Sequence, residues 1–593
     1  MREYRFTDHV SRAGDEGEWL RRLFASDRYT FKTEAGFLEP RESTAGEDFY
    51  TGTAGWIPGE GSFGEEPVFL RDTEYGVEIN SSVYPLRFGV NAAKAGRYKI
   101  TVEIEGGSDG TGSLTLCSGR RNIVERGFCV PAGKLYRKTF FYGVYPYRPV
   151  VRADEAVLDP MIGISVIGEK ARLSRICVEE VREESVPALF IGGDSTVRDY
   201  EGIYPYNPLT NGGSWGQNLQ QYLDGILVCN QAHSGLTSRC FREDGHWALV
   251  KEGLRPGDVF LFGFGHNDQK RRNLKPYDQF AANFRAYIME TRQMGAIPVL
   301  ITPMSRIPGK NEDGWYDLLE AQADSIRQVG KELKVPVIDL HSLSFRLFCS
   351  MGRDVCQQYF NDTTHVNDYG GALLAELVAE EIRRIKAEPL CSHLRIESSV
   401  DWKPDLSLRP EGREESSRIE ERPNLSTDLP ELPYADCREL PEEELQILKQ
   451  AMKQGILDPC VRYLHPHEEM PRAQFVYLLL KLVKPVEKRF WQGSFCDLSP
   501  FEFDAEQIQA ALDEDLVDPK SVLENRFRPD DPITWEETVS FVVRASYLRT
   551  ERAGLDFQSC WEIAESRGWL PKTWKDRKSP ATRAECIGMV IKL

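Results

Sequence analysis

The chain has 593 residues, of which 41% are hydrophobic and 28% are charged. These proportions are typical of globular proteins and exclude a fibrous, collagen-like or wholly disordered chain. The formal net charge of −18 argues against general binding to nucleic acid or to anionic lipid, unless a local basic patch overrides it. The longest apolar runs fall short of the roughly 18 residues that a membrane span needs, so we expect no span.

The amino terminus and the cysteines bear on where the protein works. No apolar stretch follows the early charges of the first residues, so they do not have the pattern of a secretory signal. The 13 cysteines are scattered and include no CxxC pair, which favours free thiols in a reducing compartment over disulfides or a zinc site. We therefore expect a cytoplasmic protein; the alternative is the cell surface, if a leader is missing.

Residues 1–183 are expected to form an all-β sandwich. Short alternating runs, such as 96–107 and 134–145, are separated by turn residues at short intervals. Aromatic residues are frequent in the second of these runs. They serve either as ordinary core and sheet-face residues or as platforms that stack on sugar rings.

Residues 184–388 have a different pattern, in which five apolar runs alternate with longer amphipathic stretches. This alternation predicts βα units around a buried parallel sheet. Residues 389–438 are dominated by Glu, Arg, Pro and Ser, which predicts a linker.

Residues 439–593 are expected to be all-α and repetitive. Three segments align on Pro471, Thr534 and Thr582, and each places a turn before a short amphipathic helix. Three such units can stack into one helical module.

Three short motifs in 184–388 carry chemically useful side chains. Ser195 follows the first apolar run, at a strand end where an open α/β sheet exposes reactive groups; the alternative is a turn or a helix cap. Asn267 follows the third run and can donate a hydrogen bond to an oxyanion, or simply cap a helix. Asp362 lies three residues before His365, close enough to hold its imidazole in the tautomer that accepts a serine proton; the alternative is a surface pair.

Together these motifs resemble the blocks of the SGNH (GDSL-type) hydrolases, because GDST, GHND and DxxH occur in that order. Within that superfamily the sequence is most similar to the rhamnogalacturonan acetylesterases of carbohydrate esterase family twelve. Residues 229–239 resemble the second block of that family, although Asn230-Gln231 replaces its asparagine-aspartate pair. The resemblance spans about 187–388 and implies a three-layer, flavodoxin-like α/β/α catalytic domain.

The resemblance also implies roles for individual residues. Ser195 would be the nucleophile, His365 the general base and then acid, and Asp362 the residue that orients the imidazole. The oxyanion would be held by the amides of Ser195 and Gly235 and by the side chain of Asn267. A serine hydroxyl needs an adjacent base to react at neutral pH, so the residues and the resemblance agree. No cofactor and no metal are expected.

The flanking regions resemble two further families. The amino-terminal sandwich is similar to the galactose-binding-like domain that precedes some of these esterases. The carboxy-terminal repeats are similar to surface-layer homology motifs, which would imply docking on an anionic cell-wall polymer, although Trp535 stands where that motif has arginine. The alternative is a module that packs on the esterase or mediates self-association.

These observations predict a serine esterase that removes O-acetyl groups from a pectin-type, rhamnogalacturonan-like polysaccharide or its oligosaccharides. A basic run of Lys270, Arg271 and Arg272 follows Asn267 and is expected to attract the carboxylate of an acidic sugar; the alternative is a solvated loop. Two other functions remain open. One is a non-catalytic protein that binds glycan or cell wall, and the other is an esterase with a different acyl substrate, since the fold does not set specificity.

Overall fold

The contacts of the chain divide it into two compact units, and each is considered by itself. The first comprises 1–264, 284–309 and 326–419, and the second comprises 265–283, 310–325 and 420–593. The computed structural model describes residues 1–7, 20–29, 33–38, 56–58, 67–148, 156–311, 314–395, 402–409, 432, 434–457, 463–483, 494–498, 504–517, 525–547, 555–570 and 576–593.

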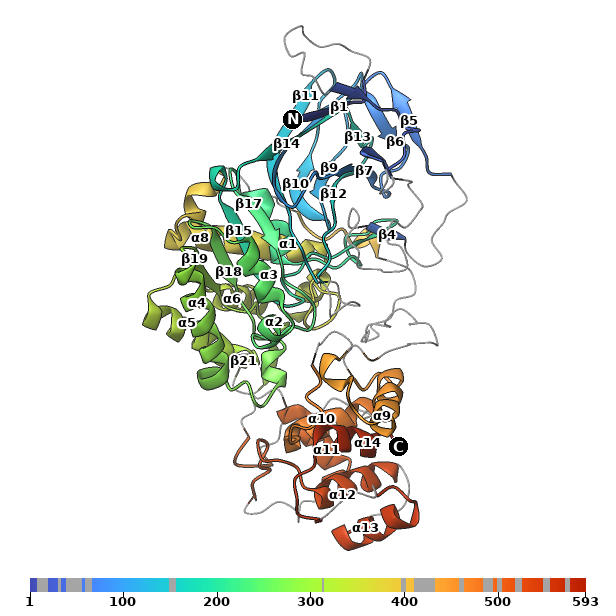
Figure 1. The fold of residues 1–593 in the computed structure, drawn as a ribbon, viewed down its shortest axis with the longest axis vertical. Coiled ribbons are helices and arrows are strands. Elements are labelled where there is room, and N and C mark those ends of the chain that lie inside the picture. Colours follow the sequence, from blue (N-terminus) through green and yellow to red (C-terminus); the bar gives the residue numbers. More distant parts are fainter. Residues whose placement is uncertain are drawn as a thin grey trace. The chain divides into compact units, whose positions relative to one another are not determined.

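The first unit begins with a β domain that contains two five-stranded sheets (Figure 1). Their strand orders are β11-β8-β14-β1-β2 and β10-β9-β12-β7-β3, and every pairing except β1 with β2 is antiparallel. Residues from both sheets, including Ile100 and Val90, belong to one buried cluster, so the inner faces of the sheets share a core. The strands are β1 (Arg2–Arg5), β2 (Leu20–Arg22), β3 (Ala35–Phe37), β7 (Leu86–Asn91), β8 (Gly96–Glu105), β9 (Leu114–Ser118), β10 (Asn122–Phe128), β11 (Leu135–Val144), β12 (Met161–Gly168) and β14 (Arg175–Val181).

A parallel sheet follows in the same unit, with the order β17-β15-β18-β19-β22. Numbered along the chain, this order is 2-1-3-4-5, so the direction of winding reverses between β15 and β18. Ligands of open α/β sheets bind at such a switch point, outside the carboxyl ends of the strands. The strands are β15 (Ala188–Gly192), β17 (Leu227–Asn230), β18 (Val259–Phe262), β19 (Ile297–Ile301) and β22 (Val337–Ile338).

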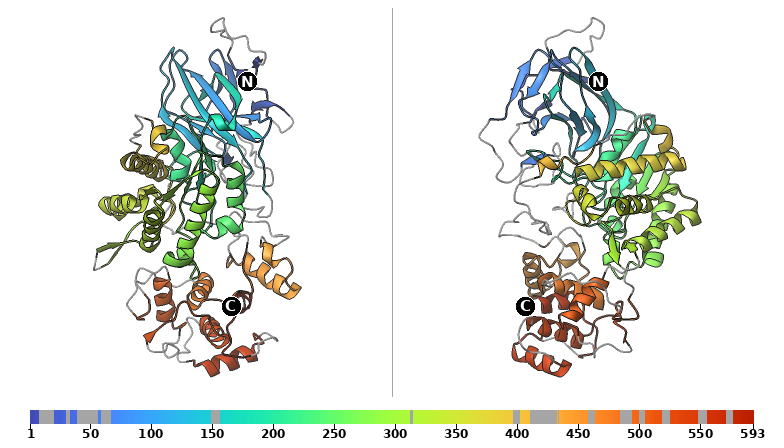
Figure 2. Two further views of the ribbon diagram at one scale, coloured as in Figure 1. Left: turned by 60° about the vertical axis from the view of Figure 1, so that its left-hand side comes forward. Right: turned by 180° about the vertical axis from the view of Figure 1, so that it is seen from behind.

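Helices cover both faces of this sheet because its strands bury side chains on both sides. Leu189 and Leu261 share a core with α1 and α8, whereas the ring of Phe260 packs on Trp247 of α3 and near Tyr287 of α4. In Figure 2 the gold helix α8 is in front of the sheet in the view from behind. The parallel sheet and its two helical layers agree with the predicted α/β fold. The helices are α1 (Trp215–Asn218), α2 (Cys240–Glu243), α3 (His246–Gly253), α4 (Ala281–Gln293), α5 (Glu320–Leu333), α6 (Leu340–Met351), α7 (Arg353–Cys356) and α8 (Asp368–Ile385).

The β domain and the parallel-sheet domain are joined within the first unit by buried polar contacts. Arg97 of β8 forms an ion pair with Asp258, and both side chains are almost completely buried. Strand β4 (Trp56–Pro58) also pairs in parallel with β16 (Gly202–Tyr204). The two domains therefore form one compact unit.

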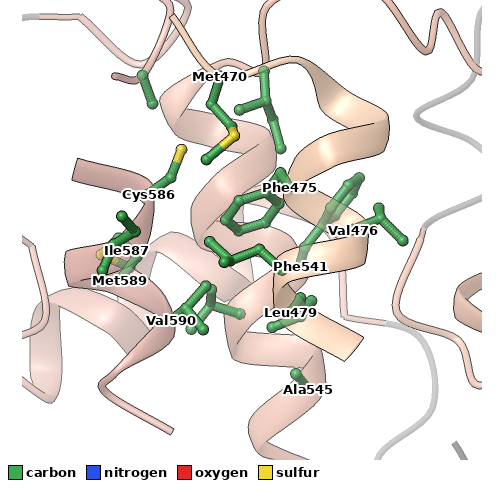
Figure 3. Packing of buried hydrophobic residues seen from close by; sticks show 14 of the residues in the cluster. Met470, Phe475, Val476, Leu479, Phe541, Ala545, Cys586, Ile587, Met589 and Val590 are labelled. Carbon is green, nitrogen blue, oxygen red and sulfur yellow. The ribbon is translucent and has the colours of Figure 1, made fainter. Parts of the chain in front are cut away.

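The second unit holds a helical module with α9 (Glu442–Lys453), α10 (Arg472–Val483), α11 (Ala505–Asp513), α12 (Trp535–Ser546), α13 (Phe557–Ser566) and α14 (Arg583–Val590). Thr534 and Thr582 begin α12 and α14 as capping boxes with glutamates three residues later. Figure 3 shows the apolar core between α10, α12 and α14, with Phe475, Phe541 and Val590 packed together.

Three backbone hydrogen bonds close the repeats of this module into a ring. The amide of Met470 donates to Ala581 O (3.0 Å), Ala581 to Ile533 O (2.9 Å), and Ile533 back to Met470 O (2.8 Å). Each of these residues directly precedes the position on which the three repeats align. The repeats are therefore equivalent in space as well as in sequence. None of the helices in the described parts of the chain is long and apolar enough to cross a membrane.

Candidate active site

Ser195 lies in a tight turn directly after β15, next to the switch point of the parallel sheet. The carbonyl oxygen of Asp194 accepts hydrogen bonds from the amides of Val197 and Arg198, both at 3.1 Å. The Asp194 carboxylate accepts two more, from the amide (2.9 Å) and the hydroxyl (2.8 Å) of Thr196. These bonds fix the turn, and Ser195 is 8% exposed within it.

The loop before α8 brings His365 to this serine. Ser195 Oγ lies 2.8 Å from His365 Nε2, although 170 residues separate them in the chain. On the other side of the ring, His365 Nδ1 lies 2.7 Å from Asp362 Oδ2. The structure thus brings together the three side chains that the sequence singled out, in the order hydroxyl, imidazole, carboxylate.

The Asp362 carboxylate is held in its ionised form. Burial by itself would raise the pKa of Asp362, but the hydrogen bond from the His365 ring and those from the amides of His365 and Thr364 hold that pKa below its ordinary value. An ionised carboxylate at Nδ1 requires the ring proton on that nitrogen. Nε2 is then the acceptor that faces the serine hydroxyl.

Gly235 lies in the loop after β17, the strand that neighbours β15. Its φ of 79° is in the left-handed region that favours glycine. The same loop is tied to the serine turn by Asn230, whose amide donates to Val197 O (2.7 Å) and to Asp199 Oδ1 (2.9 Å). Asn230 therefore supports the site in this chain, whereas the departure from the family pattern lies at the next position, Gln231.

Asn267 follows β18 and belongs, by its contacts, to the second compact unit. Lys270 Nζ donates a hydrogen bond to its side-chain oxygen at 3.1 Å. This bond fixes which end of the Asn267 amide is the donor. An oxyanion role for that donor stays a prediction.

Arg272, the last residue of the basic run after Asn267, and the nearby Lys275 form ion pairs within the second unit. Arg272 Nε lies 2.7 Å from Asp504 Oδ2, and both side chains are largely buried. Asp530 lies 3.6 Å from Arg272 and 3.0 Å from Lys275. Asp504 and Asp530, more than 200 positions away in the chain, thus supply negative charge where the carboxylate of an acidic sugar was expected to bind. For Arg272 the geometry favours a structural role, while a substrate role for Lys270 and Arg271 stays a prediction.

The β domain contacts this site through Arg121, a residue that no sequence motif singled out. Arg121, in the turn between β9 and β10, donates to Tyr200 O at 3.0 Å and to Asp368 Oδ2 at 2.7 Å. Tyr200 and Asp368 follow Ser195 and His365 closely in the chain. The only signal in the sequence was a pair of adjacent arginines in an acidic chain. Among the described residues, no group of three or more His, Cys, Asp or Glu is arranged to hold a metal.

Comparison with known proteins shows which family this sequence matches. Residues 192–373 match the GDSL-like Lipase/Acylhydrolase family. The chain is 33% identical over 222 residues to the rhamnogalacturonan acetylesterase RhgT of Bacillus subtilis (strain 168), a stretch that covers 35% of this chain and 93% of that protein. The chain belongs to the GDSL-like lipase/acylhydrolase family. The GDSL part of the predicted resemblance is thereby confirmed.

Two further relatives come from the same organism. The probable rhamnogalacturonan acetylesterase YesY is 32% identical over 208 residues, which cover 33% of this chain and 93% of that protein. The uncharacterized esterase YxiM is 31% identical over 239 residues, which cover 38% of this chain and 62% of that protein. The GDSL family match includes both Ser195 and His365.

Proposed function

We propose that this GDSL-family protein is a serine esterase that removes O-acetyl groups from a carbohydrate. The observation that carries the proposal is the continuous hydrogen-bonded line from Ser195 through His365 to Asp362, with distances of 2.8 and 2.7 Å. A surface histidine or a helix-capping serine does not require such a line of hydrogen bonds. A nucleophilic hydroxyl does, because it must lose its proton as it attacks.

The proposed reaction has two steps that use the same base. Ser195 Oγ attacks the acetyl carbon while His365 Nε2 takes the hydroxyl proton, and the proton then passes to the leaving sugar oxygen. Water next attacks the acetyl-serine while His365 takes its proton, and the imidazolium returns that proton to Ser195 Oγ as the acyl–oxygen bond breaks and acetate is released. Asp362 stays ionised and stabilises the imidazolium. In each step the carbonyl oxygen becomes negative and would be stabilised by the amides of Ser195 and Gly235 and by the Asn267 side chain.

The substrate is proposed from the relatives. Two of them are named as a rhamnogalacturonan acetylesterase and a probable one, and the similarity covers nearly all of their length. This supports an acetylated, rhamnogalacturonan-like polysaccharide or its oligosaccharides as the substrate. An acyl group other than acetyl is the second candidate within the same mechanism.

Acetate release tests the proposal directly. The purified chain should release acetate from acetylated rhamnogalacturonan oligosaccharides faster than from acetylated xylan oligosaccharides, and should hydrolyse p-nitrophenyl acetate faster than p-nitrophenyl octanoate. A preference for octanoate would replace the acetyl substrate with a longer acyl chain. Lack of hydrolysis of every ester would favour the non-catalytic glycan-binding alternative.

We also propose identities for the two flanking regions. The two mainly antiparallel sheets with a shared core support the interpretation of 1–183 as a galactose-binding-like sandwich. Docking of the helical module on a cell-wall polymer has less support. Arg472, the arginine of the first repeat, is 1% exposed and forms an ion pair with Glu537 of the second repeat. Its charge is paired within the ring of repeats and is not displayed to an external polyanion.

A further inference from the structure

The turn between β9 and β10 of the β domain carries a buried arginine in an unusual conformation. Arg121 has a φ of 63°, in the left-handed region that non-glycine residues rarely adopt. The residue is only 1% exposed. Strained backbone of this kind persists only where surrounding contacts hold it in place. The hydrogen bonds and the ion pair of the Arg121 side chain are made to the parallel-sheet domain that carries Ser195 and His365.

The first set of contacts leads to the nucleophile. Arg121 Nε donates to Tyr200 O at 3.0 Å, and the hydroxyl of Tyr200 donates in turn to Ser195 O at 2.6 Å. The side-chain amide of Gln217 donates to both Tyr200 O (2.7 Å) and Arg121 O (2.9 Å). Arg121 is therefore joined by hydrogen bonds to the peptide unit of Ser195.

The second set of contacts leads to the general base. Arg121 forms an ion pair of 2.7 Å with Asp368, whose side chain is fully buried. Asp368 is the first residue of α8 and lies three positions after His365. Arg121 also donates to Gly212 O, and Gly212 forms a β-bridge with Asn367, the residue that caps α8. The same guanidinium thus holds the segment that carries the imidazole.

Neighbouring residues of the turn contact the same region. Arg120 donates to Asn230 O at 3.3 Å, at the start of the loop that carries Gly235. Asn122 donates to Asp199 Oδ1 at 3.5 Å, a long hydrogen bond to the serine turn. One hairpin turn of the β domain therefore contacts three segments of the catalytic domain, which carry the serine, the glycine and the histidine.

We infer that Arg121 is a positioning residue for catalysis, which holds the Ser195 and His365 segments at the separation that proton transfer needs. The β domain would then be a working part of the active site, rather than an independent appendage. The inference rests on the proposed serine esterase function. A guanidinium suits this role because its planar fork presents several donors at fixed angles, which a lysine ammonium cannot do.

Arg97 provides a matched control. Like Arg121, it is a fully buried arginine of the β domain that forms an ion pair with a buried aspartate of the catalytic domain, Asp258. Asp258 directly precedes β18 and accepts a hydrogen bond from the amide of Ala188, the first residue of β15. Arg97 therefore acts at the amino ends of the strands, at the edge opposite to that of Ser195.

The test compares Arg121→Met, Arg121→Lys and Arg97→Met in the full chain. Four quantities are measured: the midpoint of thermal unfolding, the rate at which a fluorophosphonate modifies Ser195, and both kcat and KM for p-nitrophenyl acetate. Arg121→Met should slow both modification and kcat about 100-fold, the effect of a displacement of roughly 1 Å at reacting atoms, with little change in KM. Compared with Arg121→Met, Arg121→Lys should restore a larger part of the lost unfolding midpoint than of the lost kcat. Arg97→Met should lower the midpoint but keep both rates within about 3-fold of wild type.

Each outcome bears on a different claim. If Arg121→Met and Arg97→Met lose activity equally, or if Arg121→Met keeps its rates, the arginine only joins two domains and the inference is wrong. If the wild-type protein itself does not react with the fluorophosphonate, the proposed function fails instead. Should the Arg121 variants not fold, Tyr200→Phe removes the hydroxyl that binds Ser195 O. It should slow modification about 10-fold, and an unchanged rate would overturn the inference.

Discussion

Replacing Asp362 by asparagine tests the orientation of the imidazole with very little change in shape. The asparagine oxygen can still accept from the amides of Thr364 and His365, which now bind Asp362 Oδ1 at 2.6 and 2.7 Å. The new NH2 group replaces the oxygen that lies 2.7 Å from His365 Nδ1. Since an NH2 group donates, Nδ1 must become the acceptor, and the ring proton moves to Nε2. Nε2 then faces Ser195 with a proton and cannot accept another.

The expected magnitude follows from this loss of the reactive tautomer. In a serine–histidine–aspartate triad such a change lowers kcat by about 10⁴-fold, which corresponds to about 5 kcal/mol of transition-state stabilisation. KM should change little because Asp362 does not contact the acyl group in the proposed mechanism. The assay is hydrolysis of p-nitrophenyl acetate, with the thermal unfolding midpoint as a check on folding.

Asp354→Asn is the matched control, because it removes an exposed carboxylate from α7. It should leave kcat within about 2-fold of wild type, as surface changes away from the site usually do. A folded Asp362→Asn protein with less than about a 10-fold loss of kcat would refute the reasoning, since the carboxylate would then not set the tautomer.

The lowered pKa of Asp362 also predicts how kcat depends on pH. The carboxylate should stay ionised as the pH falls from neutral and be lost only below its ordinary range, so protonation of Asp362 should not lower kcat at mildly acidic pH.

Two further changes test other parts of the account. Asn267→Ala should lower kcat for p-nitrophenyl acetate by about 100- to 1000-fold if the amide stabilises the oxyanion; a near-normal kcat would remove Asn267 from the mechanism. Asp159→Asn should stabilise the β domain at pH 7.5, because burial raises the pKa of Asp159 to about 6 and the folded state therefore disfavours the charged form. The asparagine oxygen can keep the hydrogen bond from the amide of Met161. The gain in the free energy of unfolding, about 1–2 kcal/mol by urea unfolding, should appear as the pH rises through 4 to 6 and vanish at pH 4. An equal gain at pH 4 would show that the charge of Asp159 is not its cause.

Much of the secondary structure could be predicted because its signals are local. The runs at 96–107 and 134–145 form β8 and β11, and the five apolar runs of the middle region form the parallel strands. The amphipathic stretch between the fourth and fifth apolar runs is an exception. Its first residues, 314–316, form β21, which pairs with β20 (Gly309–Asn311), and α5 begins only at Glu320. Pairing with another segment overrides the helical pattern at that point.

Tertiary features were predictable only where a family motif recorded them. Ser195, Asp362 and His365 could be grouped because their motifs occur in a known order. Arg121 and its partner Asp368 are 247 residues apart, and no periodicity or spacing in one sequence connects them. The pairing of Arg272 with Asp504, 232 residues away, was hidden for the same reason. Its local context of adjacent basic residues suggested a substrate site instead.

Ser195→Ala tests the central claim most directly. The change removes one hydroxyl from a turn that is held by Asp194 and Thr196, so the unfolding midpoint should stay within a few degrees of wild type. Hydrolysis of p-nitrophenyl acetate and release of acetate from acetylated oligosaccharides should both fall to the uncatalysed background or close to it, because no other group takes the place of the nucleophile. A folded Ser195→Ala protein that hydrolyses either substrate at a rate near wild type would contradict the proposed mechanism.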